Sequence, residues 1–147
     1  MRAVLSDDQI PQGDFPSEKA LSQFIEENIE DFCDHLGLTY ISHKADHDLR
    51  LVNRFGPRGR RPDFVIETEY ETVVVELKNG SGPQVRAGIG QLLDYGREFL
   101  DTKKECVMVL VSSRFDSCAA KTIEAYHLPI RYVVMSHEKT AEFVGHA

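Results

Sequence analysis

Apolar residues recur at helical spacing in three parts of the chain. After Ser17, a residue type that caps helix N-termini, they return at every third or fourth position until Gly37, which suits a helix C-terminus. The same period returns from Gln84 to about Asp101 and across residues 116–127. The sequence therefore predicts three helices, the first of them a single helix over residues 17–36.

Runs rich in Val, Ile and Thr predict strands between and after these helices. Residues 64–68 and 72–78 are joined by a short polar turn, as in a β-hairpin, and the three consecutive valines at 73–75 favour a central strand covered on both faces. Further strands are predicted at 48–55, 106–111 and 130–135, while 38–47 fits either a strand or a loop. The order α-β-β-β-α-β-α-β predicts an α/β fold with a mixed central sheet flanked by helices.

The size and composition of the chain indicate one globular domain. It has 147 residues, of which 41% are hydrophobic, and three cysteines without CxxC spacing, which fits reduced thiols rather than a disulfide scaffold. We expect the domain to cover residues 17–147, after an irregular N-terminal arm over residues 1–16 that contains Pro11, Gly13 and Pro16. No apolar run approaches the length of a membrane span, and the N-terminus lacks the apolar core of a signal peptide, so we expect a cytoplasmic protein with no membrane partner.

The charge of the chain is unevenly distributed. The net charge of −7 argues against a protein that coats nucleic acid through bulk charge. Residues 44–61, however, hold six basic and two acidic residues, a net +4, and the rest of the chain carries −11. These basic residues either solubilise a loop or contact nucleic-acid phosphates, which would position a duplex without reading its sequence. We favour phosphate contact, with Arg60 and Arg61 as the leading candidates and Arg54 and Arg58 beside them.

The most informative stretch is Pro62-Asp63, followed thirteen residues after the aspartate by Glu76-Leu77-Lys78. Side chains alternate along a strand, so Glu76 and Lys78 share a face, and pairing within the predicted hairpin brings Asp63 near Glu76. Two carboxylates beside an ammonium group suit a Mg²⁺ or Mn²⁺ site for phosphodiester hydrolysis. A lone Glu-x-Lys on a strand is often only a solvated face, so the prediction depends on the combination with Asp63.

These residues resemble the PD-(D/E)XK nuclease superfamily, whose restriction-endonuclease-like fold has an αβββαβ core. The resemblance extends over roughly residues 17–135. Within the superfamily, residues 59–63, 76–78 and 90–95 look most like the catalytic domain of mismatch endonucleases of the NucS/EndoMS type, and also like Shedu antiphage nuclease domains and type I restriction subunits. Glu18 opens the first helix where many members place an accessory acidic ligand, and Gln91 with Tyr95 resembles a Q-x-x-x-Y signature.

The resemblance implies metal-dependent hydrolysis of DNA to 5′-phosphate and 3′-hydroxyl ends, in DNA repair or antiphage defence. Asp63 and Glu76 would ligate Mg²⁺ or Mn²⁺, the Leu77 carbonyl would add a backbone ligand, and Lys78 would assist the attacking water. Glu18 would act through a metal-bound water. By the same resemblance alone, we expect a homodimer.

Other interpretations stay open beside this one. An acid in a first helical turn is also favoured by the helix dipole, which would explain Glu18 without a ligand role. Gln91 can cap a backbone group and Tyr95 can pack in the core. The fold can also serve as a catalytically silent binding module for nucleic acid or protein, or as a nuclease for RNA or branched junctions. A zinc site is not expected, since the spacing of its four candidate ligands matches no known finger: Cys33, His35, His43 and His47.

Overall fold

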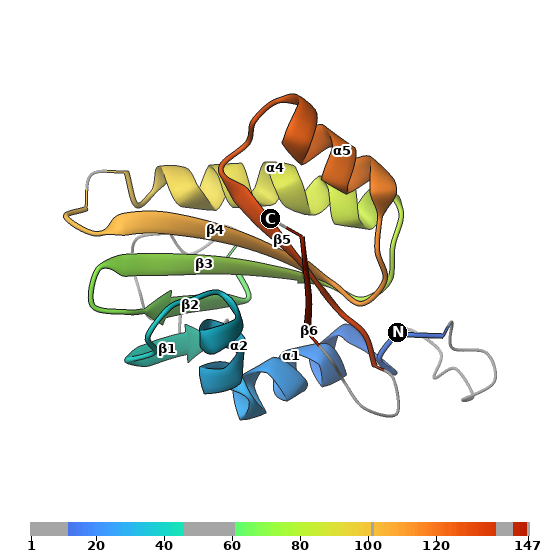
Figure 1. Ribbon diagram of the computed structural model, residues 1–147, viewed down its shortest axis with the longest axis horizontal. Coiled ribbons are helices and arrows are strands. Elements are labelled where there is room, and N and C mark those ends of the chain that lie inside the picture. Colours follow the sequence, from blue (N-terminus) through green and yellow to red (C-terminus); the bar gives the residue numbers. More distant parts are fainter. Residues whose placement is uncertain (1–11, 46–60, 101, 138–142, 147) are drawn as a thin grey trace.

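A six-stranded mixed sheet forms the centre of the protein (Figure 1). The computed structural model describes residues 12–45, 61–100, 102–137 and 143–146, the last of these by their backbone. The strands follow each other across the sheet in chain order, with β3, β4 and β5 parallel and the other neighbours antiparallel. They are β1 Ser42–Ala45, β2 Phe64–Glu67, β3 Glu71–Lys78, β4 Glu105–Ser112, β5 Ile130–Met135 and β6 Phe143–His146.

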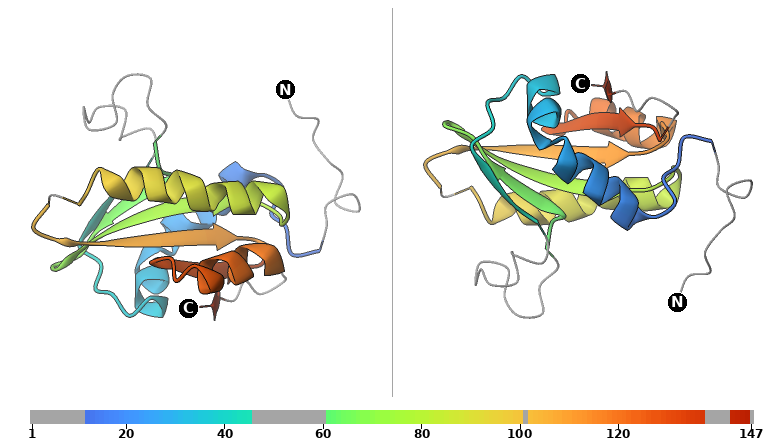
Figure 2. Two further views of the ribbon diagram at one scale, coloured as in Figure 1. Left: turned by 90° about the horizontal axis from the view of Figure 1, so that it is seen from above. Right: turned by 90° about the horizontal axis from the view of Figure 1, so that it is seen from below.

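Helices cover both faces of the sheet, so the molecule has three layers (Figures 1 and 2). Helices α1 (Glu18–Glu27) and α2 (Ile29–His35) pack on one face, and α4 (Pro83–Arg97) and α5 (Ser117–Ala125) on the other. Along β3, Val73 and Leu77 belong to the core under α1 and α2, whereas Val74 belongs to the core under α4 and α5. The α/β class with a mixed sheet flanked by helices is thus confirmed.

The β2–β3 hairpin matches the sequence prediction closely. Its strands pair antiparallel with Phe64 opposite Val75, and Thr68 closes the turn by bonding Glu71 through both its backbone and its hydroxyl. All six side chains from position 72 to position 77 are buried. This burial agrees with a central strand that is covered on both faces.

The single helix predicted over residues 17–36 is wrong, because the helix breaks at Asn28. This residue has φ −121° and ψ 32°, and its side-chain amide donates to the Phe24 carbonyl at 2.8 Å. The end predicted at Gly37 is confirmed. Gly37 has φ +74°, and the Gly37 and Leu38 N–H groups donate to Asp34 and Cys33 at 2.9 Å each, as in a Schellman motif.

Other boundaries differ modestly from the prediction. Helix α4 ends at Arg97 rather than near 101, the ambiguous segment 38–47 contains β1, and β6 was not predicted. The predicted strand 48–55 lies outside the described residues, as does most of the predicted N-terminal arm. The described end of that arm is irregular but packed, with Phe15 only 2% exposed. None of the described helices combines the length and apolar character that crossing a bilayer requires.

Candidate active site

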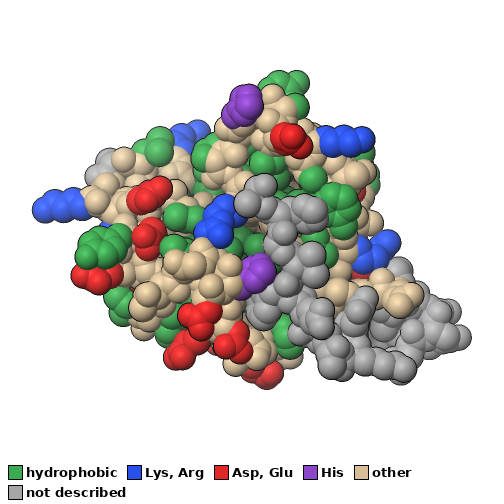
Figure 3. Space-filling view, in the orientation of Figure 1, with side chains coloured by type: hydrophobic (Ala, Val, Ile, Leu, Met, Phe, Trp, Pro, Cys, Tyr) green, Lys and Arg blue, Asp and Glu red, His purple; other side chains and the backbone are tan. Residues whose placement is uncertain are grey.

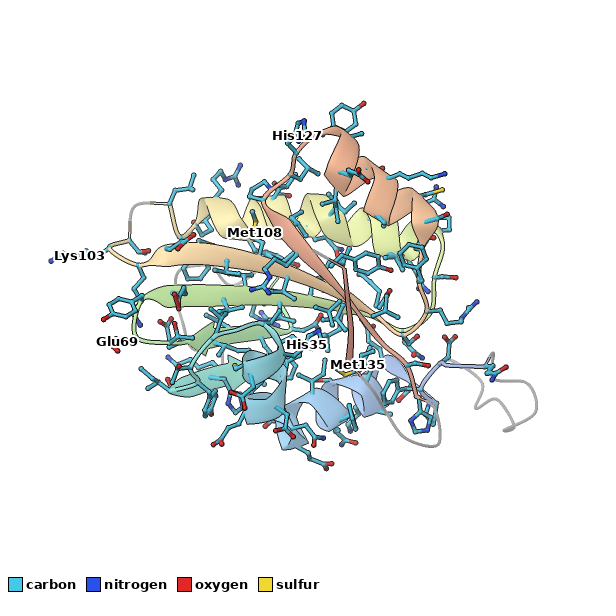
Figure 4. All side chains as sticks on the ribbon, in the orientation of Figure 1. His35, Glu69, Lys103, Met108, His127 and Met135 are labelled. Atoms are coloured by element: carbon cyan, nitrogen blue, oxygen red, sulfur yellow. The ribbon has the colours of Figure 1, made fainter. Side chains whose placement is uncertain are left out.

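The chemistry-bearing residues gather at the end of the sheet that lies away from the hairpin turn. In Figure 4 the labelled Glu69 of the hairpin turn lies at the left edge of the molecule, as does Lys103 of the loop before β4. Asp63 directly precedes β2 and Lys78 ends β3, so antiparallel pairing brings both to the open end of the hairpin. Continuing the register by one residue beyond Phe64 and Val75 sets Asp63 opposite Glu76.

Asp63 is held by the backbone of β3. Its Oδ2 accepts a hydrogen bond from the Leu77 N–H at 2.7 Å, and its own N–H donates to the Val75 carbonyl at 3.1 Å. The Asp63 carboxylate therefore accepts the hydrogen bond that a backbone carbonyl would accept if the pairing of β2 and β3 continued. Because the N–H and C=O of one strand residue point to the same side, the Leu77 carbonyl faces the Asp63 edge as well, where the resemblance expects a backbone ligand.

Glu76 is a buried carboxyl group with an unusual environment. It is 6% exposed, and its Oε2 has no hydrogen-bond partner. Burial, then a hydrogen bond and charge repulsion from the Asp63 carboxylate, raise the pKa of Glu76 to about 10, while the Lys78 ammonium acts to lower it. A carboxyl group with a pKa this high keeps its proton at neutral pH. Buried polar atoms rarely lack a partner, and a divalent cation is the kind of group that would satisfy this pair.

Lys78 is half-buried, and α4 packs over the stem of its side chain. A Cβ atom placed on Gly88 would lie 3.5 Å from the Lys78 Cε and 2.7 Å from the Leu110 Cδ1. The missing side chain at Gly88 therefore lets α4 approach Leu110 closely, and the stem of Lys78 lies beside the same glycine. The sequence prediction missed Gly88, because a glycine inside a helix signals a close approach without naming the partner.

Glu18 stands in the first turn of α1, which begins at the N-cap Ser17. The Ser17 hydroxyl accepts a hydrogen bond from the Ala20 N–H at 3.0 Å. Glu18 is exposed, and its charge is the weakest of the influences that raise the pKa of Glu76. It therefore belongs to the electrostatic environment of the pair, at longer range than Asp63.

Gln91 and Tyr95 lie on the face of α4 that also carries Gly88. Tyr95 is 5% exposed and belongs to the core between α4 and the sheet, as the packing alternative anticipated. The Gln91 Oε1 is buried and, like the Glu76 Oε2, has no hydrogen-bond partner. Among the described residues, these two oxygens are the buried side-chain polar atoms left without one.

Only one of the four arginines predicted to contact nucleic acid can be placed. Arg61 is half-buried and directly precedes Pro62 and Asp63. Arg54, Arg58 and Arg60 lie outside the described residues. On the described surface, Figure 3 shows acidic side chains gathered over α1 and α2.

The described part of the chain contains no group of three or more His, Cys, Asp or Glu side chains that could hold a metal ion. For Mg²⁺ this is compatible with a site, since Mg²⁺ commonly binds through one or two carboxylates and keeps several waters. Of the four residues weighed as zinc ligands, His47 lies outside the described residues. Burial and the neighbouring Asp34 and Glu30 raise the pKa of the Cys33 thiol to about 11, and His43 contacts Tyr40 and Glu26 instead.

Comparison with models of protein families, with curated proteins and with solved structures gives no match to this chain.

Proposed function

We propose that the chain is a metal-dependent endonuclease of the PD-(D/E)XK superfamily that hydrolyses phosphodiester bonds in DNA. The order of a helical segment, three strands, a helix and a strand from α1 to β4 is compatible with the restriction-endonuclease-like core. Asp63, Glu76 and Lys78 lie at one end of the β2–β3 hairpin. Both features support the proposal.

One observation carries the assignment. The Glu76 side chain is 6% exposed, its Oε2 has no hydrogen-bond partner, and the Asp63 carboxylate hydrogen-bonds to it. Burying a carboxyl pair in this way is unfavourable unless a ligand compensates for the lost solvation. A purely structural residue at this position would be better served by an apolar side chain. The pair is therefore best explained as a site kept for a cation.

Each of these residues has its own part in the proposed chemistry. Asp63 and Glu76 would hold the ion, the Leu77 carbonyl faces the same edge, and Lys78 would supply a positive charge where the phosphate gains negative charge. When bound, Mg²⁺ or Mn²⁺ supplies Lewis-acid stabilisation of the phosphate and lowers the pKa of a water. Arg61 lies beside Asp63 in the sequence, where it can contact a backbone phosphate.

The test is incubation of supercoiled plasmid with purified protein in Mg²⁺, Mn²⁺ or EDTA. Nicking should require the metal and should disappear in Lys78→Ala, which also controls for contaminating nucleases. Cleavage that persists in Lys78→Ala, or that proceeds in EDTA, would contradict the proposal.

A second candidate function is a catalytically silent module that binds DNA or a protein partner. It is favoured by the lack of a third acidic or histidine ligand among the described residues. It predicts DNA binding that neither metal nor EDTA changes, with no nicking. Measuring DNA binding in the presence and absence of Mn²⁺ separates the two candidates.

A further inference from the structure

The segment that leads into α1 crosses the two loops at the open end of the sheet. Asn79, the residue after Lys78, holds it with two hydrogen bonds: the Phe15 N–H donates to the Asn79 Oδ1 at 2.9 Å, and the Asn79 Nδ2 donates to the Phe15 carbonyl at 2.8 Å. One side chain thus pairs with both backbone groups of a residue 64 positions away. We call residues 13–15 the N-terminal strap.

A second set of contacts fixes the strap to the loop after β4. Asp14 is 9% exposed and accepts hydrogen bonds from the Ser113 hydroxyl and from the Arg114 Nε, each at 2.8 Å. The Ser113 hydroxyl in turn accepts from the Gly80 N–H at 2.5 Å. The loops after β3 and β4 are therefore joined to each other and to the strap.

The path of the strap leaves little freedom to the start of α1. Gly13 pairs with His137, has φ +94°, and has no room for a Cβ, which would lie 2.9 Å from the Ser136 Oγ. The Phe15 ring is buried against Phe24 of α1, at 5.5 Å between centroids. Glu18 comes only three residues after Phe15, so its position relative to β3 depends on how the strap is held.

We propose that Asn79 is a positioning residue that fixes Glu18 relative to Asp63 and Glu76 by clamping the strap to the end of β3. The inference rests on the proposed function, because it assigns Glu18 an indirect role in binding the cation. Two observations connect the Asn79–Phe15 contact with the site and not only with stability. Asn79 directly follows Lys78 in the chain, and the charge of Glu18 acts on Glu76.

The experiment measures Mn²⁺ affinity by titration calorimetry in the full chain, with the Asn79→Ala variant, the Glu18→Gln variant and the double variant. Loss of a supporting contact typically weakens metal binding about tenfold or more. We expect Asn79→Ala and Glu18→Gln each to raise the Mn²⁺ Kd about tenfold, and the double variant to bind no more weakly than Glu18→Gln alone. Nicking by Asn79→Ala should recover at saturating Mn²⁺.

Asn28→Ala is the matched control, because it also removes an asparagine bond to a backbone carbonyl but lies at the break between α1 and α2. It should leave the Mn²⁺ Kd unchanged. If Asn79→Ala does not fold, Asp14→Asn loosens the same strap from its other side and should shift the Kd in the same direction.

An unchanged Kd in a folded Asn79→Ala variant would overturn the inference and leave the nuclease proposal standing. So would a tenfold effect that persists in the Glu18→Gln background, since Asn79 would then act by another route. A wild-type protein that neither binds Mn²⁺ nor nicks plasmid would overturn both.

Discussion

The Asp63 carboxylate accepts the Leu77 N–H at 2.7 Å, so one side chain both ends the β2–β3 ladder and faces Glu76. The residue proposed as a cation ligand therefore also has a structural role. Substitutions at Asp63 must separate the two roles before loss of activity can be assigned to lost chemistry.

Asp63→Asn makes that separation. Its amide oxygen can still accept the Leu77 N–H, whereas the charge that attracts a divalent cation is removed. We expect plasmid nicking to be abolished and the free energy of unfolding to stay within about 1 kcal/mol of wild type. Asp63→Ala should lose roughly 1–3 kcal/mol in addition, because the Leu77 N–H is left unpaired. Urea unfolding beside the nicking assay gives both readings, and nicking by a folded Asp63→Asn variant would contradict the proposed role.

Glu76→Gln should stabilise the metal-free protein at neutral and alkaline pH. The pKa of Glu76 is raised from 4.5 to about 10 in the folded state. Within that window the folded protein holds a proton that the unfolded chain has released, so stability falls as the pH rises. Glutamine has no such proton, and the variant should lose this pH dependence.

In EDTA, we expect Glu76→Gln to exceed wild type by several kcal/mol at pH 8 and to match it near pH 4, because wild type loses about 1.4 kcal/mol of stability per pH unit between the two pKa values. Urea unfolding across this range measures the difference, with Glu27→Gln on the exposed side of α1 as the control. If the stability of wild type and of Glu76→Gln changes with pH in the same way, the pKa of Glu76 is not raised in the folded protein.

The hairpin and the proximity of Asp63 to Glu76 could be predicted because their signals are local. The valines of β3 and the short turn after Glu67 specify the strands, and alternation then decides which side chains share a face. The proximity of Asp63 and Glu76 follows from that pairing alone. The packing of the helices does not affect this proximity.

The remaining features depend on contacts between distant parts of the chain. The helical spacing of apolar residues continues through Asn28, so nothing in that pattern reveals that the backbone leaves the helical conformation there. Asn79 appears in the sequence as part of a loop, because its partner Phe15 is 64 residues away. The same holds for Gly88, whose role depends on the side chains of β3 and β4 that lie beneath it.

Tyr132→Phe should loosen the loop after β4 that holds the strap. The Tyr132 hydroxyl accepts the Asp116 N–H at 2.9 Å and bonds the Ser112 hydroxyl inside the protein. Removing it leaves buried groups unpaired, so we expect a loss of about 1–3 kcal/mol in the free energy of unfolding. Tyr126→Phe, at a position 75% exposed, should change stability by less than about 0.5 kcal/mol in the same urea titration. Equal effects of the two variants would show that the Tyr132 hydroxyl is not a structural link.

Gly88→Ala and Gly90→Ala form a matched pair within α4. A Cβ at Gly88 would lie 2.7 Å from the Cδ1 of the buried Leu110, whereas a Cβ at Gly90 would meet nothing within 4 Å. We expect Gly88→Ala to cost about 1–3 kcal/mol through overpacking. Gly90→Ala should gain roughly 0.5–1 kcal/mol, because alanine loses less backbone entropy in a helix.

The pair also separates stability from the position of Lys78. Nicking should fall in Gly88→Ala even at temperatures where the variant is fully folded, because relieving the close contact with Leu110 requires a shift of α4, which also packs on the lysine stem. It should be unchanged in Gly90→Ala. Thermal unfolding and single-turnover nicking at a fixed Mn²⁺ concentration provide the two measurements. A folded Gly88→Ala variant that nicks at the wild-type rate would mean that Lys78 does not depend on the clearance left by this glycine.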